Sequence, residues 1–310
     1  MAMKTAVVGV GALGQHHARI HSELPQADLA AVVDIDQQRA MEVAQSCGCP
    51  FLFDYRDILD PQRVQAVSLA VPTEEHCRLA CDFLRLGIHV LVEKPMASNL
   101  KEAQQMLEAQ REGGARLQVG HSERFNPAWM AARPHIKKPG FFEVHRMASF
   151  VPRSLDIDVV LDLMIHDLDL ILQVAGSPLK EVRAVGIPVL TPREDIANVR
   201  LEFESGCVAN LTASRISASR IRKLRLFQPH DYISVDFQKR RVQMYSLAQG
   251  GGSFNIVRGD LEIGDQEPLR SEIEQFLEDG PLACSGEDGF RVLALATEIK
   301  ATIAGQKIQV

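Results

Sequence analysis

Near its N-terminus the chain reads Thr5-Ala6-Val7-Val8-Gly9-Val10-Gly11-Ala12-Leu13-Gly14. The apolar start of this stretch predicts a buried strand, and the helical pattern that begins at Gly14 predicts a helix directly after a turn. Gly9, Gly11 and Gly14 fit the pattern G-x-G-x-x-G in the strand-turn-helix context that dinucleotide binding requires. The first glycine permits the tight turn, the second lets the backbone approach a pyrophosphate, and the third lets helix and strand pack closely. The stretch therefore predicts a Rossmann domain.

Strands and helices continue to alternate as far as Val119. Further strands are expected at Leu29–Val33, Val64–Val71, Ile88–Val92 and Leu117–Val119, separated by helices at Gly14–Glu23, Gln37–Ser46, Thr73–Leu86 and Leu100–Glu112. These apolar runs lack clean alternation with polar residues, as strands covered on both faces do. The β-α-β-α series indicates an α/β protein with a doubly wound parallel sheet at its N-terminus.

After His121 the pattern changes to strands that follow one another. They are expected at Phe141–Phe150, Glu181–Val189, Ala197–Glu204, Cys207–Ser217, Lys223–Phe227, Tyr232–Gln238 and Arg241–Ser246. Sequential strands of this kind predict a largely antiparallel sheet in an α+β domain. One helix interrupts the series at Val159–Val174, Gln249–Ser253 is expected as a flexible loop, and a helix from Gly289 to Ala304 closes the chain.

The length of 310 residues fits two domains. We expect domains at 1–122 and 123–310, and the C-terminal helix could pack back on the first. Lys and Arg number 34 and Asp and Glu 40, so the net charge is −6, which disfavours a nucleic-acid partner. No apolar run approaches the ~20 residues that span a bilayer, and the start resembles no signal peptide. We therefore predict a cytoplasmic protein with no membrane partner.

The six cysteines do not form two pairs at the spacing of a zinc finger. We read them as free thiols in a reducing compartment, and we predict no metal site.

Asp34 follows the second expected strand, about 20 residues after the glycine loop, where Rossmann domains place an acidic residue. Its carboxylate can accept from both ribose hydroxyls and would repel a 2′-phosphate. Ile35 follows Asp34 in place of an arginine, and Arg39 stands a helical turn away. The pattern therefore favours NAD over NADP, the alternative being an ordinary turn with a solvated Asp. The candidate cofactor residues in this region are Gly9, Gly11, Ala12, Leu13, Gly14, Asp34, Ile35 and Arg39.

Two further sets of polar residues stand where chemistry is expected. Glu93-Lys94-Pro95 ends a buried strand, where ligands bind in open α/β sheets, although a surface lysine would look the same. Asp162 and His166 are four residues apart, so they share one face of a helix. Histidine titrates near neutral pH and suits proton transfer, although a hydrogen-bonded core histidine is the alternative.

Five segments in the same order resemble the glucose-fructose oxidoreductase, inositol dehydrogenase and rhizopine-catabolism (Gfo/Idh/MocA) family. They are the glycine loop, Ala70-Val71-Pro72-Thr73 with His76, Glu93-Lys94-Pro95, Gly120–Pro127 and Leu161–Asp169. The resemblance implies that Lys94 is the active-site lysine. It also implies that the cofactor contacts include Val71, Pro72, Thr73, His76, Glu93 and Lys94.

The resemblance further implies an open-faced, mostly antiparallel C-terminal sheet that forms a homodimer or homotetramer. The implied activity is dehydrogenation of a sugar hydroxyl, with Lys94, His166 and Asp162 as catalytic residues. Lys94 would hold the hydroxyl oxygen, His166 or Lys94 would take its proton, and Asp162 would orient the sugar or the imidazole.

Two segments of the second half bear on the substrate. Asp195–Phe203 and Cys207–Arg215 are similar to a subgroup of the family, the UDP-N-acetylglucosamine 3-dehydrogenases of bacterial lipid A synthesis, whose product goes to a partner aminotransferase. Arginine forks suit diphosphates. The candidate substrate-binding residues are Arg124, Asn126, Arg153, Asp162, Arg215 and Arg220.

Arg215 falls on the apolar face of its expected strand, so it points into the cleft between the domains or finds a buried partner. Exposed charges on an edge strand and hairpin remain the alternative for the arginine cluster as a whole. A dehydrogenase of a free sugar or inositol, and a non-catalytic nucleotide-sensing regulator, stay open as other functions. Lys94 together with His166 argues against the regulator, and the arginines argue against a free-sugar enzyme.

Overall fold

The computed structural model describes residues 2–151, 157–250 and 253–305, apart from the side chains of residues 248–255. The chain divides into two units. The first comprises Met1–Ser122 and Glu267–Leu293, and the second comprises Glu123–Gln266 and Ala294–Val310. The boundary expected after residue 122 is also where the first segment of the first unit ends. Segment 267–293 belongs to the first unit, although the sequence pattern had placed it in the second.

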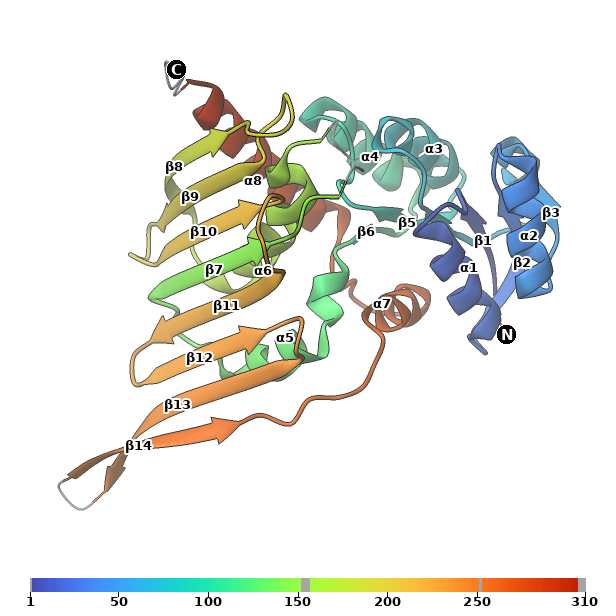
Figure 1. The fold of residues 1–310 in the computed structure, drawn as a ribbon. Coiled ribbons are helices and arrows are strands. Elements are labelled where there is room, and N and C mark those ends of the chain that lie inside the picture. Colours follow the sequence, from blue (N-terminus) through green and yellow to red (C-terminus); the bar gives the residue numbers. More distant parts are fainter. Residues whose placement is uncertain (1, 152–156, 251–252, 306–310) are drawn as a thin grey trace. The chain divides into compact units, whose positions relative to one another are not determined.

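A six-stranded parallel sheet forms the centre of the first unit (Figure 1). Its strands are β1 (Met3–Val8), β2 (Ala27–Val33), β3 (Phe51–Leu52), β4 (Ala66–Leu69), β5 (His89–Glu93) and β6 (Leu117–Gly120). They lie in the order β3-β2-β1-β4-β5-β6, which is the order of dinucleotide-binding sheets whose topology reverses between β1 and β4. The predicted Rossmann fold is confirmed. The two-residue strand β3 was not predicted, because it is too short to show a pattern.

The helices of this unit begin and end at the expected places. They are α1 (Gly14–Glu23), α2 (Gln37–Cys47), α3 (Thr73–Arg85) and α4 (Leu100–Gly113), with a short 3-10 helix, η1, at Tyr55–Ile58. A further helix, α7 (Pro268–Leu277), comes from the C-terminal segment. Its Ile273 and Phe276 pack in one buried cluster with Ile20 of α1 and with Leu24, the residue after that helix. Helix α7 was not predicted from the sequence.

An eight-stranded sheet forms the second unit. Its strands are β7 (Phe141–Met147), β8 (Leu179–Ile187), β9 (Ile196–Phe203), β10 (Val208–Ser214), β11 (Ile221–Gln228), β12 (Asp231–Asp236), β13 (Arg241–Gly250) and β14 (Ser253–Asp260). They lie in the order β14-β13-β12-β11-β7-β10-β9-β8, and β7 and β10 are the parallel pair in an otherwise antiparallel sheet. The prediction of a mostly antiparallel sheet is confirmed.

The prediction of a flexible loop at Gln249–Ser253 is wrong for the described residues of that range. Gln249 and Gly250 are paired in β13, and Ser253 begins β14; residues 251 and 252 lie outside the described residues. The alternation along β7 buries Phe142, Val144 and Arg146 on one face of the sheet.

Helices cover that face of the second sheet. They are α5 (Pro127–Ala132), a π-helical segment η4 (Val160–Met164) that continues as α6 (Ile165–Ala175), and the last turns of α8 (Gly286–Gly305), which begins in the first unit. Two 3-10 segments, η2 (Ser122–Phe125) and η3 (Arg133–His135), flank α5. The opposite face carries no helix in the described part of this unit (Figure 1).

Candidate functional site

The glycine loop between β1 and α1 has the backbone that a dinucleotide site needs. Gly9 has φ +80, and a Cβ there would lie 2.7 Å from the carbonyl oxygen of Ala70. A Cβ on Gly14 would lie 1.8 Å from the carbonyl oxygen of Gly9, so both positions require glycine. A Cβ on Gly11 would meet only Arg39 Nη1, at 3.9 Å. The backbone at Gly11 therefore stands beside open space that a ligand could enter.

The start of α1 offers hydrogen-bond donors to that space. Leu13 caps the helix without a side-chain hydrogen bond, and the N–H groups of Ala12 and Leu13 have no acceptor among the described residues. Open N–H groups at a helix N-terminus, with the positive end of the helix dipole, suit a phosphate. The loop thus fits the pyrophosphate of a dinucleotide, whose nicotinamide supplies hydride chemistry when bound.

Asp34 lies at the end of β2 and holds this loop in place. Its Oδ2 accepts from Val10 N at 2.8 Å, and its Oδ1 accepts from Asp36 N at 2.9 Å. The carboxylate is buried, and Arg39 Nη1 lies 3.6 Å from Oδ2. Ile35 is 93% exposed. The structure therefore brings Asp34 and Arg39 to the glycine loop, and Ile35 projects into solvent.

Glu93, the last residue of β5, connects the start of the Lys94-Pro95 loop to α1. Its Oε1 lies 3.0 Å from Nε2 of the buried His17, and its Oε2 accepts from the backbone N of Lys94 at 3.2 Å. Burial alone would raise the pKa of Glu93, but the hydrogen bond from His17 and the nearby positive charges hold it below its usual value. The carboxylate is therefore ionised at neutral pH. Lys94 is half-buried, and the Lys94-Pro95 peptide is cis.

His76 joins the two loops that follow β4 and β5. Its Nδ1 lies 2.9 Å from the carbonyl oxygen of Pro95, and its Nε2 lies 3.0 Å from that of Val71. Burial lowers the pKa of His76, although both hydrogen bonds oppose the shift. The structure thus brings Val71, His76 and the Lys94-Pro95 loop together, with Pro72 and Thr73 at the start of α3.

Asp162 and His166 belong to the second unit. Asp162 lies in the π-helical segment η4, and His166 lies one residue into α6. Oδ1 of Asp158 accepts from the N–H groups of Val160 and Leu161 at 3.0 Å and so begins this segment. π-helical turns are frequent at functional sites. Both predicted catalytic side chains are half-buried and stand within one helical turn of each other. Lys94 lies in the other unit, so its joint action with them stays a prediction.

Arg124 and Asn126 already have partners within the second unit. Nε of Arg124 lies 2.8 Å from Oδ2 of the buried Asp169. Asn126 begins α5 by accepting from Ala128 N at 3.0 Å, and its Nδ2 donates to Glu123 Oε2 at 3.0 Å. These contacts give both side chains a structural role, and their contact with a substrate stays a prediction.

Arg215 takes the second of its two expected alternatives, a buried partner. It is 5% exposed, and its Nε lies 3.3 Å from Oδ1 of Asp195. Its Nη2 also donates to the carbonyl oxygens of Glu194, at 3.2 Å, and Ile157. Arg215 therefore ties together three segments of the second unit. Arg153 lies outside the described residues.

Arg146, on the buried face of β7, was not among the predicted site residues. Its Nε lies 2.7 Å from Oδ2 of Asp167 and its Nη1 lies 3.0 Å from Oε1 of Glu123. Burial opposes its charge, but the two carboxylates hold the pKa of its guanidinium above the usual value. The alternation Phe142, Val144, Arg146 was the signal that could have found it, since it turns Arg146 inward.

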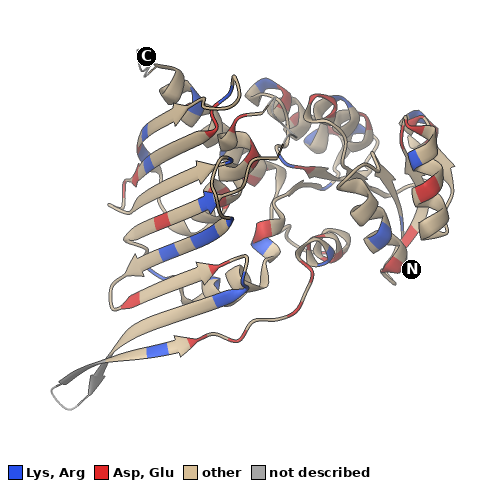
Figure 2. Cartoon of the chain, viewed as in Figure 1, with Lys and Arg blue, Asp and Glu red and all other residues tan. Residues whose placement is uncertain are grey.

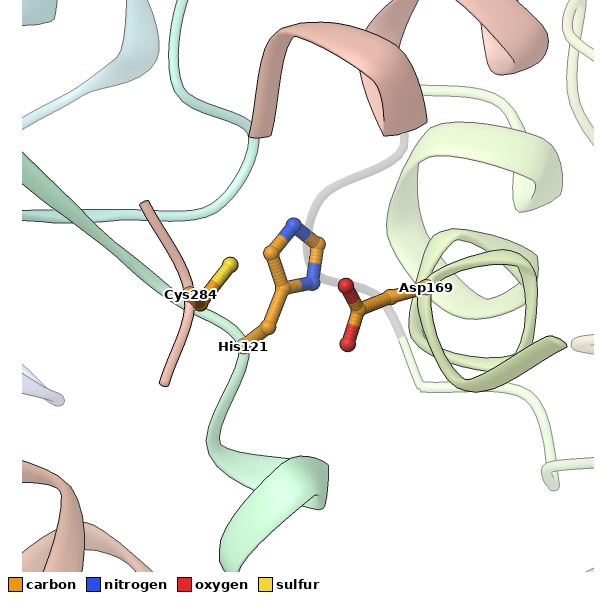
Figure 3. A group of neighbouring side chains, drawn as sticks. All are labelled: His121, Asp169 and Cys284. Atoms are coloured by element: carbon orange, nitrogen blue, oxygen red, sulfur yellow. The ribbon is translucent and has the colours of Figure 1, made fainter. Parts of the chain in front are cut away.

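None of the six cysteines forms a disulfide, and all six lie in the part of the chain that the structure describes. Figure 3 shows Cys284 beside His121, both in the first unit, with possible ligand atoms within 4.8 Å of each other. Asp169, drawn in the same figure, pairs with Arg124 within the second unit. His121 and Cys284 provide two ligands, fewer than a protein zinc site uses, so the expected absence of a metal stays a prediction. Among the described residues, no helix is both long and apolar enough to cross a membrane.

Comparison with known families agrees with this geometry. A family model described as an oxidoreductase family with an NAD-binding Rossmann fold matches residues 3–121, and the C-terminal domain model of the same family matches residues 100–228. The chain belongs to the Gfo/Idh/MocA family of oxidoreductases. The resemblance of its motifs is confirmed, and the chain is an enzyme with an NAD(P)-binding Rossmann domain.

Individual relatives match over almost the whole chain. A UDP-N-acetylglucosamine 3-dehydrogenase from Acidithiobacillus ferrooxidans is 37% identical over 97% of both chains. Its solved structure has a TM-score of 0.89 and covers 98% of this chain and 99% of that one. A scyllo-inositol 2-dehydrogenase (NAD(+)) of Bacillus subtilis is 29% identical over 89% of this chain and 85% of that one. A levoglucosan dehydrogenase in complex with NADH and L-sorbose, 17% identical, shares the fold with a TM-score of 0.88, covering 98% of this chain and 97% of that one.

Proposed function

We propose that this enzyme oxidises the 3-hydroxyl of UDP-N-acetylglucosamine and transfers the hydride to NAD. The observation that carries the proposal is the similarity to the Acidithiobacillus ferrooxidans enzyme of that name, which extends over 97% of both chains. The inositol dehydrogenases that also resemble the chain match at lower identity or over less of it: the Bacillus subtilis enzyme is 29% identical over 89% of this chain, and that of Rubrobacter xylanophilus is 36% identical over 53%. The presence of Lys94 and His166 supports a catalytic enzyme and argues against a non-catalytic, nucleotide-sensing regulator.

The residues of the chain divide the work of such a reaction. Lys94 would hold the reacting hydroxyl oxygen, and His166 or Lys94 would take its proton. Asp162 would orient the sugar or the imidazole from the same helical turn. The pair of Arg146 and Asp167 fixes the helix on which His166 stands, because it binds the residue directly after it. A positioned acid or base of this kind contributes about 10²–10⁴ in rate.

NAD is proposed over NADP because the buried carboxylate of Asp34 stands at the glycine loop. A second negative charge, on a 2′-phosphate, would be repelled there. Arg39 favours NADP, since its guanidinium lies 3.6 Å from that carboxylate and is half-exposed.

A homodimer or homotetramer through the open face of the second sheet is also proposed. Four aromatic rings, of Phe141, Phe227, Tyr232 and Tyr245, cross neighbouring strands on this face. Neighbouring ring centroids are 5.7, 4.9 and 5.5 Å apart, and Phe227 is 39% exposed. Exposed aromatic residues are enriched at protein interfaces. Light scattering of the purified chain would show a monomer if this proposal is wrong.

The cellular setting is proposed on chemical grounds. A 3-keto sugar nucleotide is a substrate for an aminotransferase, so we propose such a partner enzyme and a role in lipid A synthesis. Six cysteines without a disulfide among them support a reducing compartment, and the cytoplasm is proposed.

The deciding experiment is to follow NADH formation with UDP-N-acetylglucosamine and, in parallel, with myo-inositol, scyllo-inositol and free N-acetylglucosamine. Turnover of the inositols alone would favour an inositol dehydrogenase. NADH binding without turnover of any of these compounds would favour a nucleotide-sensing regulator.

A further inference from the structure

A basic pocket of about 460 Å³ lies in the second unit, within the size range of small-molecule sites. We define the basic pocket by its charged lining, namely Arg220, Arg222, Lys223, Arg225, Lys239 and Asp236. The lining therefore contains five cationic residues and one carboxylate, in a chain whose net charge is −6. Lys and Arg positions gather on β11, which forms one wall (Figure 2). Such local positive charge is unexpected from the composition.

Most of these cations have no counter-charge. The side chains of Arg220, Lys223 and Lys239 make no hydrogen bond or ion pair with any described residue. Arg222 is within ion-pair distance of Glu123 alone among the described residues, at 3.7 Å. Arg225 is the paired member, 2.7 Å from Glu143.

The basic residues of the edge strand β8 differ in this respect. Lys180 and Arg183 on the edge strand β8 each pair with a glutamate, at 2.6 and 2.7 Å. Like charges held close together repel one another, and a bound anion removes that repulsion. In agreement, burial and the neighbouring charge of Arg146 hold the pKa of Arg222 below its usual value.

The strand register places the basic pocket relative to the candidate catalytic helix. Arg222 is paired in register with Arg146, whose guanidinium binds Asp167 beside His166. The pocket and His166 thus lie at the same end of the sheet. Lys223 is paired with His145 and Asp236. Its side chain projects from the face of the sheet opposite to that of Arg222, since side chains alternate along a strand. The aromatic rings of the open face lie four residues further along the strands, about 13 Å away.

We propose that the basic pocket binds a diphosphate group. Guanidinium forks match phosphate oxygens in pairs, and lysines add point charges. Two linked phosphoryl groups carry two or more negative charges. These would match the unpaired positive charges of Arg220, Lys223 and Lys239. The diphosphate can be part of the nucleotide-sugar substrate, and this source rests on the proposed function. It can also be a free diphosphate ion, a source that does not depend on the proposed function.

Calorimetric titration of the full chain with pyrophosphate, at fixed ionic strength, tests the proposal. Uridine serves as the uncharged comparison. We expect pyrophosphate to bind and uridine to bind far more weakly. Arg220→Gln and Lys223→Gln should each weaken pyrophosphate binding about tenfold. Arg183→Gln removes one charge from the same sheet outside the pocket and should change nothing. Absence of pyrophosphate binding, or an equal loss in Arg183→Gln, overturns the proposal.

Steady-state kinetics then separate the two sources. If the diphosphate belongs to the substrate, pyrophosphate competes with UDP-N-acetylglucosamine, and Lys223→Gln raises KM more than it lowers kcat. If it is free, pyrophosphate binds without competing. Pyrophosphate binding in a protein that ignores UDP-N-acetylglucosamine would refute the proposed function and leave the pocket standing. A change of oligomer mass in Lys223→Gln, with pyrophosphate binding intact, would make the pocket a protein interface and refute the proposal.

Discussion

Nε of Arg146, on β7, lies 2.7 Å from Oδ2 of Asp167, the residue that follows His166 on α6. Both side chains are almost completely buried, and the guanidinium reaches a second carboxylate, Glu123, at 3.0 Å. The sheet of the second unit therefore fixes the helix that carries the proposed proton acceptor through a charged contact. Such a contact orients a helix more specifically than apolar packing does.

Arg146→Met should destabilise the protein by about 3–5 kcal/mol, because it leaves two buried carboxylates without their cation. Urea unfolding of the full chain measures the loss. Arg146→Lys keeps the charge and loses the fork, so we expect a smaller loss. Wild-type stability in Arg146→Met would show that this contact does not hold the helix.

Arg215→Ala should lower stability by about 2–3 kcal/mol, since it removes the cation that pairs with the buried Asp195 and the donor to the carbonyl oxygens of Ile157 and Glu194. KM for UDP-N-acetylglucosamine should stay nearly unchanged, because the guanidinium is occupied within the second unit. Thermal unfolding and steady-state kinetics on the same preparation test both statements. A large rise in KM with unchanged stability would return Arg215 to the substrate site.

Arg215 shows which structural features strand periodicity can predict and which it cannot. Strand periodicity placed this residue on a buried face, but it could not choose between a cleft and a partner. Asp195 and Arg215 are distant in sequence and meet only through the pairing of β9 with β10. The pairs of Arg124 with Asp169 and of Arg146 with Asp167 depend on tertiary packing in the same way.

Local signals account for what the sequence analysis found and for some of what it missed. The glycine loop and Asp34 lie within one β-α-β unit, so local pattern was sufficient to predict the Rossmann fold. Helix α7 had a readable signal, since Pro268 stands at its first turn and Leu269, Ile273 and Phe276 follow at helical spacing. Strand β3 had none.

Stability should fall in acid because of His21. Burial, and then the neighbouring His17, lower the pKa of His21 from 6.5 to about 3. Between these values the unfolded chain binds a proton that the folded chain does not. The stability that the neutral, buried His21 contributes is therefore complete above pH 6.5 and is lost as the pH falls toward 3.

At pH 5 this loss is roughly 2 kcal/mol. His21→Gln removes the titrating group, so its free energy of unfolding should fall less than that of the wild type between pH 7 and pH 5. Urea unfolding at both pH values measures the difference. Equal losses in the two proteins would contradict the buried, neutral state of His21.

Asp34→Ser should relax the preference for NAD, because it removes the carboxylate that would repel a 2′-phosphate. Dissociation constants of NADH and NADPH, measured by fluorescence, should differ in the wild type in favour of NADH and converge in the variant. NADPH that binds the wild type as tightly as NADH would mean that Arg39, and not Asp34, decides the choice.

Lys94→Ala and His166→Ala should each lower kcat by about 10²–10⁴, with NADH binding nearly unchanged. If the two residues act on the same hydroxyl, the double variant should be little worse than the poorer single variant. Fully multiplicative losses would show that they act independently.

The most direct test of the account is the reaction of the purified enzyme with NAD and UDP-N-acetylglucosamine. We expect NADH to form together with an equal amount of a 3-keto sugar nucleotide, identified by mass spectrometry and NMR, and expect Lys94→Ala to lose this activity. An enzyme that reduces NAD with a free sugar or an inositol, and leaves UDP-N-acetylglucosamine unchanged, would contradict the account.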